Sequence, residues 1–173
     1  MCRHSFNAMP HIRHTLLIAA TAEKVYHAIN SQEGLAAWWT PEVIASPEKD
    51  SIARFNFGPD YYKEMKITGL QPTQLVTWLC IAGAAEWIGT DIRFELTAVN
   101  KTILQNLYAE MSGQAEQQPA NTLTLLHFHH DNWKEYTPMF AECNYTWGRF
   151  LWSLKLYCET GKGLPWPQQH QVY

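Results

Sequence analysis

The 173-residue sequence lacks any apolar run of bilayer-spanning length. Its longest apolar stretches, around residues 16–20 and 79–85, fall far short of the roughly 20 residues that a span requires. It also lacks an excess of basic residues, since its net charge is −3 and its pI about 6.2, which leaves nucleic-acid binding without an electrostatic basis. Residues 1–10 are polar and contain no apolar core of a signal peptide. We therefore expect no membrane span, no nucleic-acid partner and a cytoplasmic location.

Recognisable catalytic and metal-binding motifs are missing as well. No GxSxG nucleophile motif occurs, and the four cysteines form no CxxC pair. Cys143 and Cys158 would lie about 22 Å apart on one helix and cannot bridge each other, so reduced thiols are expected. His127 and His129 share a strand face that could chelate a metal, but no third ligand stands at motif spacing, which favours solvated surface histidines. The sequence thus predicts no metal, no cofactor and no catalytic residue set.

Aromatic residues, in contrast, are abundant. They make up 13% of the chain, with eight tryptophans, and 46% of all residues are hydrophobic. A chain of this length suits one domain with a sizeable core. The aromatic content therefore indicates either a bulky packed core or a lined cavity.

Residues 136–161 are predicted to form one amphipathic helix about 35 Å long. Thr137 suits the N-cap and Pro138 the first helical position, while Gly161 suits the end, with prolines just beyond it. Such a helix, aromatic on one side, needs a large apolar surface to lie against. Residues at three- and four-residue intervals form its apolar face: Phe140, Cys143, Trp147, Leu151, Leu154 and Cys158.

The upstream chain is predicted to begin with a strand over residues 12–19, followed by two short helices capped by Thr21 and Ser31. One of Trp38 and Trp39 is expected to be buried. Strands followed by a terminal helix favour an α+β fold in which the helix packs on one face of the sheet. Further strand-like segments lie near residues 52–57, 62–68, 74–81, 86–99 and 122–130.

An insertion interrupts this order at about residues 101–120. Residues 101–114 carry Ile and Leu at helical spacing and are predicted to be an amphipathic helix, with an extended hairpin as the alternative. We expect one domain over residues 12–167, preceded by a flexible tail at residues 1–11.

Several segments, taken in order, resemble a known family: GLAAWW, EWIGTD, HFHHDNW and TWGRFLWSLKLYCETG. They are similar to the START-like, or birch-pollen-allergen-like, superfamily (SRPBCC), and more narrowly to the branch named after the activator of the ninety-kilodalton heat-shock protein's ATPase. The resemblance implies a helix-grip fold, in which a curved antiparallel sheet of about seven strands holds the C-terminal helix around a deep apolar cavity. The extra segment near residues 104–111 departs from the family pattern and could cover or narrow the cavity mouth.

The predicted ligand site consists of inward-facing side chains, any one of which is more often core than ligand contact. His130 ends the inward face of its strand and His14 that of a neighbouring strand, so the two imidazoles could approach each other. Two satisfied core histidines are the alternative interpretation. The site residues are Trp39, Phe57, Trp78, Ile92, Phe94, Phe128, His130, Phe140, Cys143, Trp147 and Leu151.

These features favour a non-enzymatic carrier or sensor that binds a small hydrophobic molecule, such as a lipid or an aromatic compound, in the cavity. One alternative is a metal-independent cyclase or hydratase acting on such a compound through His130 or Tyr157. The other is a co-chaperone-like interaction domain with a chaperone as its partner. A homodimer is a common state for small domains and is an additional expectation.

Overall fold

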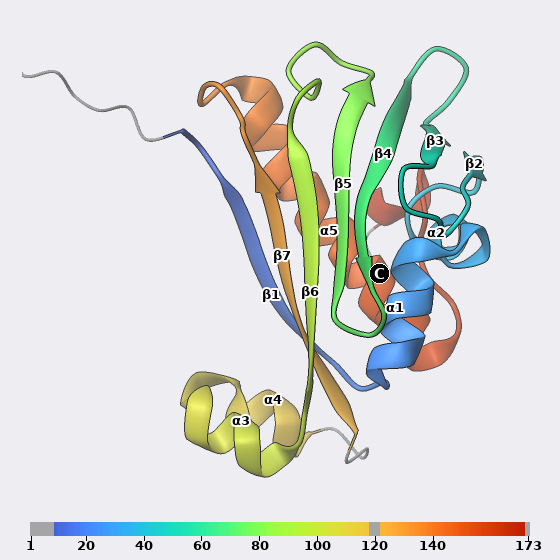
Figure 1. The fold of residues 1–173 in the computed structure, drawn as a ribbon. Helices are drawn as coiled ribbons and strands as arrows, with labels where there is room; N and C mark the ends of the chain where they lie inside the picture. The colour runs from blue at the N-terminus through green and yellow to red at the C-terminus, as the bar shows by residue number, and fades with distance from the viewer. Residues whose placement is uncertain (1–8, 118–121, 172–173) are drawn as a thin grey trace, which may run out of the picture.

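The computed structural model describes residues 9–117 and 122–171. Its strands are β1 (Ile12–Ile18), β2 (Val43–Ile44), β3 (Ile52–Asn56), β4 (Tyr62–Gln71), β5 (Leu75–Ala82), β6 (Asp91–Val99) and β7 (Leu123–Asp131). They form one antiparallel sheet in the order β1-β7-β6-β5-β4-β3-β2, so the first and last strands are neighbours. The helix α5 (Pro138–Thr160) runs along one face of this sheet (Figure 1). The expected α+β helix-grip architecture is confirmed.

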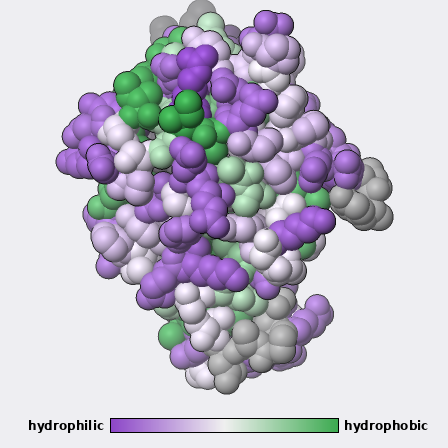
Figure 2. All heavy atoms as spheres, turned by 90° about the vertical axis from the view of Figure 1, so that its right-hand side faces the viewer, coloured by the Kyte–Doolittle hydropathy of each residue, from purple (hydrophilic) through white to green (hydrophobic). Residues whose placement is uncertain are grey.

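The sheet has open edges at β1 and at the two-residue strand β2. Figure 2 shows that the side of the molecule near β2 is mostly hydrophilic, with a compact hydrophobic patch. Within the described residues, no helix has the length and apolarity needed to cross a bilayer. Residues 1–8, with Cys2, lie outside the described part, so the flexible tail and the domain limits stay predictions.

Both ends of α5 follow the sequence signals. The hydroxyl of Thr137 accepts a hydrogen bond from the Phe140 amide, and Pro138 occupies the first turn, where its missing N–H is not needed. Gly161 ends the helix in the left-handed conformation, with φ 83°. The predicted face is turned to the sheet, because Trp147, Leu151, Leu154 and Cys158 are all buried.

The two short helices α1 (Ala22–Asn30) and α2 (Gln32–Trp38) begin at Thr21 and Ser31, as predicted, and each cap accepts an amide hydrogen bond. Both Trp38 and Trp39 are buried, so the expectation that only one would be buried is wrong. The indole of Trp38 donates to the Ala28 carbonyl at 2.8 Å, which satisfies its N–H inside the core. Trp39 ends the helix and turns into the space between α5 and the sheet.

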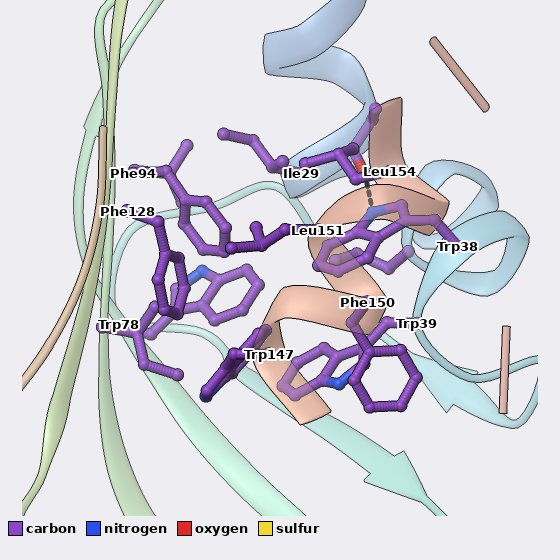
Figure 3. Close-up of a cluster of buried hydrophobic side chains, with 14 of the residues drawn as sticks. Ile29, Trp38, Trp39, Trp78, Phe94, Phe128, Trp147, Phe150, Leu151 and Leu154 are labelled. Carbon is purple, nitrogen blue, oxygen red and sulfur yellow. Dashed lines mark hydrogen bonds between the residues drawn. The ribbon is translucent and has the colours of Figure 1, made fainter. Parts of the chain in front are cut away.

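Aromatic rings fill the centre of that space. Figure 3 shows Trp78, Phe94 and Phe128 reaching from the strands toward Trp147 on α5, with Trp39 on the other side. The ring centroids of Phe128 and Trp147 are 4.5 Å apart, and those of Trp39 and Trp147 are 5.2 Å apart. Rings at these separations are in direct contact, so this part of the interior is packed.

The insertion is helical and not a hairpin, which confirms the first of the two interpretations. It forms α3 (Lys101–Leu107), a 3₁₀ turn η1 (Ala109–Met111) and α4 (Ser112–Glu116), whereas residues 118–120 lie outside the described part. It lies at the lower end of the sheet in Figure 1, where Leu104 packs on the face of the sheet opposite α5. The expectation that it covers the cavity mouth is therefore wrong. The residues it packs against are Leu17, Val99, Leu123 and Leu125.

The strand expected over residues 86–99 begins at Asp91, because a compact turn precedes it. Gly83 and Gly89 adopt positive φ angles of 135° and 88°, which reverse the chain between β5 and β6. The turn places the Trp87 side chain against the core, where it is 4% exposed.

Candidate functional site

A pocket of about 200 Å³ lies between the β3–β4 hairpin, the first half of α5 and the segment that follows α5. It is partly open to solvent. The side chains of Met139 and Cys143 on α5 form part of its wall. Its aromatic lining consists of Trp39, Phe57, Trp87, Trp147, Phe150 and Trp166. Its polar lining consists of Tyr61, Lys63, Glu142, Thr146, Gln169 and His170.

The aromatic walls come from distant parts of the chain. Trp39 contacts Phe57 with ring centroids 5.7 Å apart, and Phe57 contacts Phe150 at 6.3 Å. Trp166 lies beyond the end of α5, and its amide donates to the Trp39 carbonyl at 2.8 Å, which holds the last segment against the pocket. The wall is therefore built from rings that are fixed by their neighbours, a feature of preformed small-molecule sites.

Lys63 is the exceptional residue of this pocket. It belongs to the inward face of β4 with Met65 and Ile67, and it is only 5% exposed. Its ammonium donates to the Tyr61 hydroxyl at 3.0 Å. It also faces the rings of Tyr61, Phe57 and Trp87, with Nζ-to-centroid distances of 4.1, 4.4 and 4.4 Å. These rings stabilise a cation through their π faces.

Within the described part of the chain, no carboxylate forms an ion pair with Lys63. Burial therefore dominates its titration and lowers the pKa of the ammonium to about 8. Burial also raises the pKa of Tyr61 to about 12, so its hydroxyl stays protonated at neutral pH. The pocket thus holds a desolvated cation that no carboxylate of the described residues neutralises.

A second buried polar group lines the pocket from the short 3₁₀ helix η2 (Gln168–His170). Gln169 is 3% exposed, and its side-chain oxygen has no hydrogen-bond partner among the described residues. Its backbone carbonyl accepts from Nε of Arg149 at 2.7 Å, which anchors η2 to α5. The Gln169 backbone is therefore held in place, while its side-chain oxygen has no described partner.

Cys143 does not have the character of a nucleophile. Its sulfur accepts a hydrogen bond from the Trp87 indole at 3.1 Å. Burial raises the pKa of the thiol, and the nearby Lys63 only partly opposes that effect. The thiol is therefore protonated at neutral pH, which agrees with its interpretation as an inert lining residue.

The predicted site residues fall into two groups. Trp39, Phe57, Cys143 and Trp147 line the pocket. The others lie in the packed core and line no part of this pocket. These core residues are Trp78, Ile92, Phe94, Phe128, His130, Phe140 and Leu151.

His130 is fully buried and does not pair with His14. Its Nδ1 accepts from the Trp147 indole at 3.1 Å, and its Nε2 lies 2.9 Å from the Thr90 hydroxyl. In the strand register His130 stands opposite Ile12, whereas His14 stands opposite Phe128. The hypothesis of two approaching imidazoles is thus wrong, and the interpretation of His130 as a satisfied core histidine is correct.

The other two histidines of the HFHH segment, His127 and His129, lie on the outer face of the sheet. His127 contacts Thr15, and His129 lies 3.5 Å from the Glu95 carboxylate. Across residues 9–117 and 122–171, no three His, Cys, Asp or Glu side chains are grouped in a way that could hold a metal ion.

Several solved structures share this architecture. The solution structure of the Aha1 dimer from Colwellia psychrerythraea is 34% identical, with a TM-score of 0.70 over 90% of this chain and 100% of that chain. DynU16, a protein in the dynemicin biosynthetic locus, is 17% identical with a TM-score of 0.63, over 88% of this chain and 48% of that chain. CalU16 from Micromonospora echinospora is 14% identical with a TM-score of 0.58, over 85% of this chain and 73% of that chain.

The two more distant likenesses support the fold alone. No protein-family model matches the sequence, and no curated protein matches it. The Colwellia protein, in contrast, is similar in both sequence and structure over its whole length. The chain therefore belongs to the Aha1-like branch of the START-like (SRPBCC) superfamily.

Proposed function

We propose that the protein binds a small hydrophobic molecule, a lipid or an aromatic compound, in the pocket between the sheet and α5, and acts as its carrier or sensor. The observation that carries this proposal is the preformed aromatic wall around Trp39, Phe57 and Trp147. Ligand sites of this kind are concave and mostly apolar, with a few placed polar groups.

The size of the pocket limits the ligand. Its volume of about 200 Å³ lies below the ~300–1,000 Å³ typical of sites for drug-sized molecules. A compound with one to three rings, or a short branched chain, matches this volume. Its affinity would come from apolar surface removed from water, at about 25 cal/mol per Å².

A binding role is favoured over catalysis by the positions of the candidate acid and base groups. His130 and Tyr157 are absent from the pocket lining, and the Cys143 thiol is protonated. A co-chaperone-like role is the remaining alternative, and it requires no ligand in the pocket. Because the Colwellia relative is a dimer, we also propose that this chain forms a homodimer in the cytoplasm, which light scattering of the purified protein tests.

The binding proposal is tested with N-phenyl-1-naphthylamine, a neutral probe whose fluorescence rises in apolar sites. Thr146→Trp places an indole in the pocket, and we expect it to abolish the fluorescence rise. Ala141→Trp puts the same side chain on an exposed position of α5 outside the pocket and should bind like the wild type. Equal binding by all three proteins, or no binding by the wild type, would overturn the proposal.

Native mass spectrometry gives a test without a chosen probe. The purified protein is compared under native and denaturing conditions, and we expect a small passenger that is released on denaturation. The same passenger should be missing from Thr146→Trp. A mass equal to that of the bare chain, together with no binding of the naphthylamine probe, would favour the protein-interaction role.

A further inference from the structure

The polar contents of the pocket indicate the chemical class of its ligand. The ammonium of Lys63 carries three N–H donors. Only one of them is used in a described hydrogen bond, which it donates to the Tyr61 hydroxyl. The faces of the surrounding rings attract its charge, but among the described residues no second oxygen accepts a hydrogen bond from the ammonium. A buried ammonium ordinarily has an ion-pair partner, so its partner is expected to come from outside the chain.

Gln169 is a second buried polar residue of the same pocket. Its side-chain oxygen is buried and has no hydrogen-bond partner among the described residues. Buried polar atoms in native proteins are nearly always hydrogen-bonded. Two buried polar residues, one cationic and one neutral, therefore line the same cavity.

We propose that the ligand is a small organic carboxylate with an aromatic or branched apolar body, whose carboxylate pairs with the ammonium of Lys63. This inference rests on the proposed function and assigns its ligand class. The body lies against the rings of Trp147 and Phe57, while the carboxylate takes the place of the missing counter-ion. A monoanion matches one buried cation, whereas a phosphate would bring more charge than one ammonium neutralises.

Glu142 also lines the pocket and would repel an anion, but its position makes the effect small. Glu142 is exposed, so water screens its charge. Lys63 is buried, where charges interact more strongly. The net field at the inner end of the pocket therefore favours a negative group.

Isothermal titration calorimetry with two isosteric probes tests this inference. The anionic probe is 2-naphthoate, and the neutral probe is 2-nitronaphthalene, whose planar nitro group has the shape of a carboxylate. The wild type should bind 2-naphthoate more tightly than 2-nitronaphthalene. Lys63→Met should weaken 2-naphthoate binding by roughly ten- to a hundredfold, as expected for a hydrogen bond to a charged group, and leave 2-nitronaphthalene binding unchanged.

Two further variants complete the experiment. Lys66→Met removes a partly exposed lysine of the same strand that pairs with Asp50, and it should bind both probes like the wild type. Lys63→Arg keeps the charge and should retain the preference for the anion. Binding of 2-nitronaphthalene by Lys63→Met also shows that the variant is folded.

The results distinguish failure of the carboxylate–Lys63 pairing from failure of apolar ligand binding, on which that pairing rests. If Lys63→Met binds 2-naphthoate as tightly as the wild type, the inference is overturned and the apolar pocket stands. If the wild type binds both probes equally, the same conclusion follows. If neither probe binds the wild type up to its solubility limit, the inference and the proposed function both fail.

Discussion

The indole N–H of Trp147 on α5 donates a hydrogen bond to Nδ1 of His130 on β7, at 3.1 Å. Since this nitrogen accepts, the imidazole carries its proton on Nε2 and donates it to the Thr90 hydroxyl, which in turn donates to the Trp87 carbonyl. A neutral histidine therefore connects the helix to the sheet behind the pocket. Its role is to fix the position of Trp147, which forms part of the pocket wall.

This connection predicts a pH dependence of stability. Burial lowers the pKa of His130 to about 3, whereas an exposed histidine of the unfolded chain titrates near ~6.5. Between these values the unfolded chain binds the extra proton, so the free energy of unfolding should fall as the pH falls, by up to ~1.4 kcal/mol per pH unit. Urea unfolding across this range should show a smaller slope in His130→Asn than in the wild type. Identical slopes would contradict the neutral, buried state of His130.

Removing the Ser153 hydroxyl should lower the free energy of unfolding by an amount that does not depend on pH. Its buried hydroxyl donates to the Trp38 carbonyl at 2.8 Å and accepts from the Leu164 amide at 2.7 Å, which joins α2, α5 and the last segment. Ser153→Ala leaves two backbone groups without partners and should cost about 1–3 kcal/mol in urea unfolding. Thr160→Ala, which removes an exposed hydroxyl from the same helix, serves as the control and should cost much less. A loss no larger than that of the control would show that water replaces the hydroxyl.

The charge of Glu142 should oppose anion binding. Glu142→Gln removes a like charge from the pocket rim, and we expect 2-naphthoate to bind about two- to fivefold more tightly, the effect of an exposed charge. The affinity for 2-nitronaphthalene should not change. Glu135→Gln removes an exposed carboxylate outside the pocket and should alter neither affinity. Weaker binding of 2-naphthoate by Glu142→Gln would place the anionic group elsewhere.

The titration of Lys63 should appear in the binding of 2-naphthoate. The pKa of Lys63 in the free protein is about 8, so the ammonium is present at pH 7 and is lost as the pH rises. Affinity should stay level below pH 8 and then fall toward the Lys63→Met value by about pH 10. The variant should show no such fall, and calorimetry at several pH values measures both. An affinity of the wild type for 2-naphthoate that stays constant up to pH 10 would show that Lys63 does not bind the carboxylate.

Burial keeps the neighbouring thiols and the Tyr61 hydroxyl protonated near pH 8, where Lys63 begins to lose its proton. Burial raises the pKa of Cys80 to about 11 and that of Tyr61 to about 12, and it raises the pKa of the Cys143 thiol. His130 is neutral throughout, because its pKa lies near 3. The titratable or charged groups around Lys63 and along the pocket are Tyr61, Cys80, Glu86, His130, Glu142, Cys143 and His170.

The fold could be predicted from local signals that act within a few residues. Thr137, Pro138 and Gly161 define the ends of α5 through capping, and alternation in residues 122–130 identifies which side chains face the helix. The insertion was harder, because Leu and Ile suit both helices and strands. Its helical form buries Leu104 against the outer face of the sheet, a contact that no local pattern reveals.

The residues of the pocket could be predicted only in part from the sequence. Periodicity shows that Phe94 and Phe128 point inward, but whether a ring fills the core or borders a space depends on how all the rings pack. Lys63 shares its strand face with Met65, so alternation contains the signal, but a lysine is almost never fully buried without a partner, which argues against an inward position. Gln169 lies in an irregular segment after α5, where no periodicity applies.

We propose that a small apolar anion occupies the space between α5 and the sheet. A crystal structure of the protein with 2-naphthoate tests it most directly. We predict difference density for one naphthalene ring system beside Trp147, with its carboxylate within hydrogen-bond distance of Nζ of Lys63. Density for the probe on the outer surface alone, with the pocket closed by its own side chains, would contradict the account.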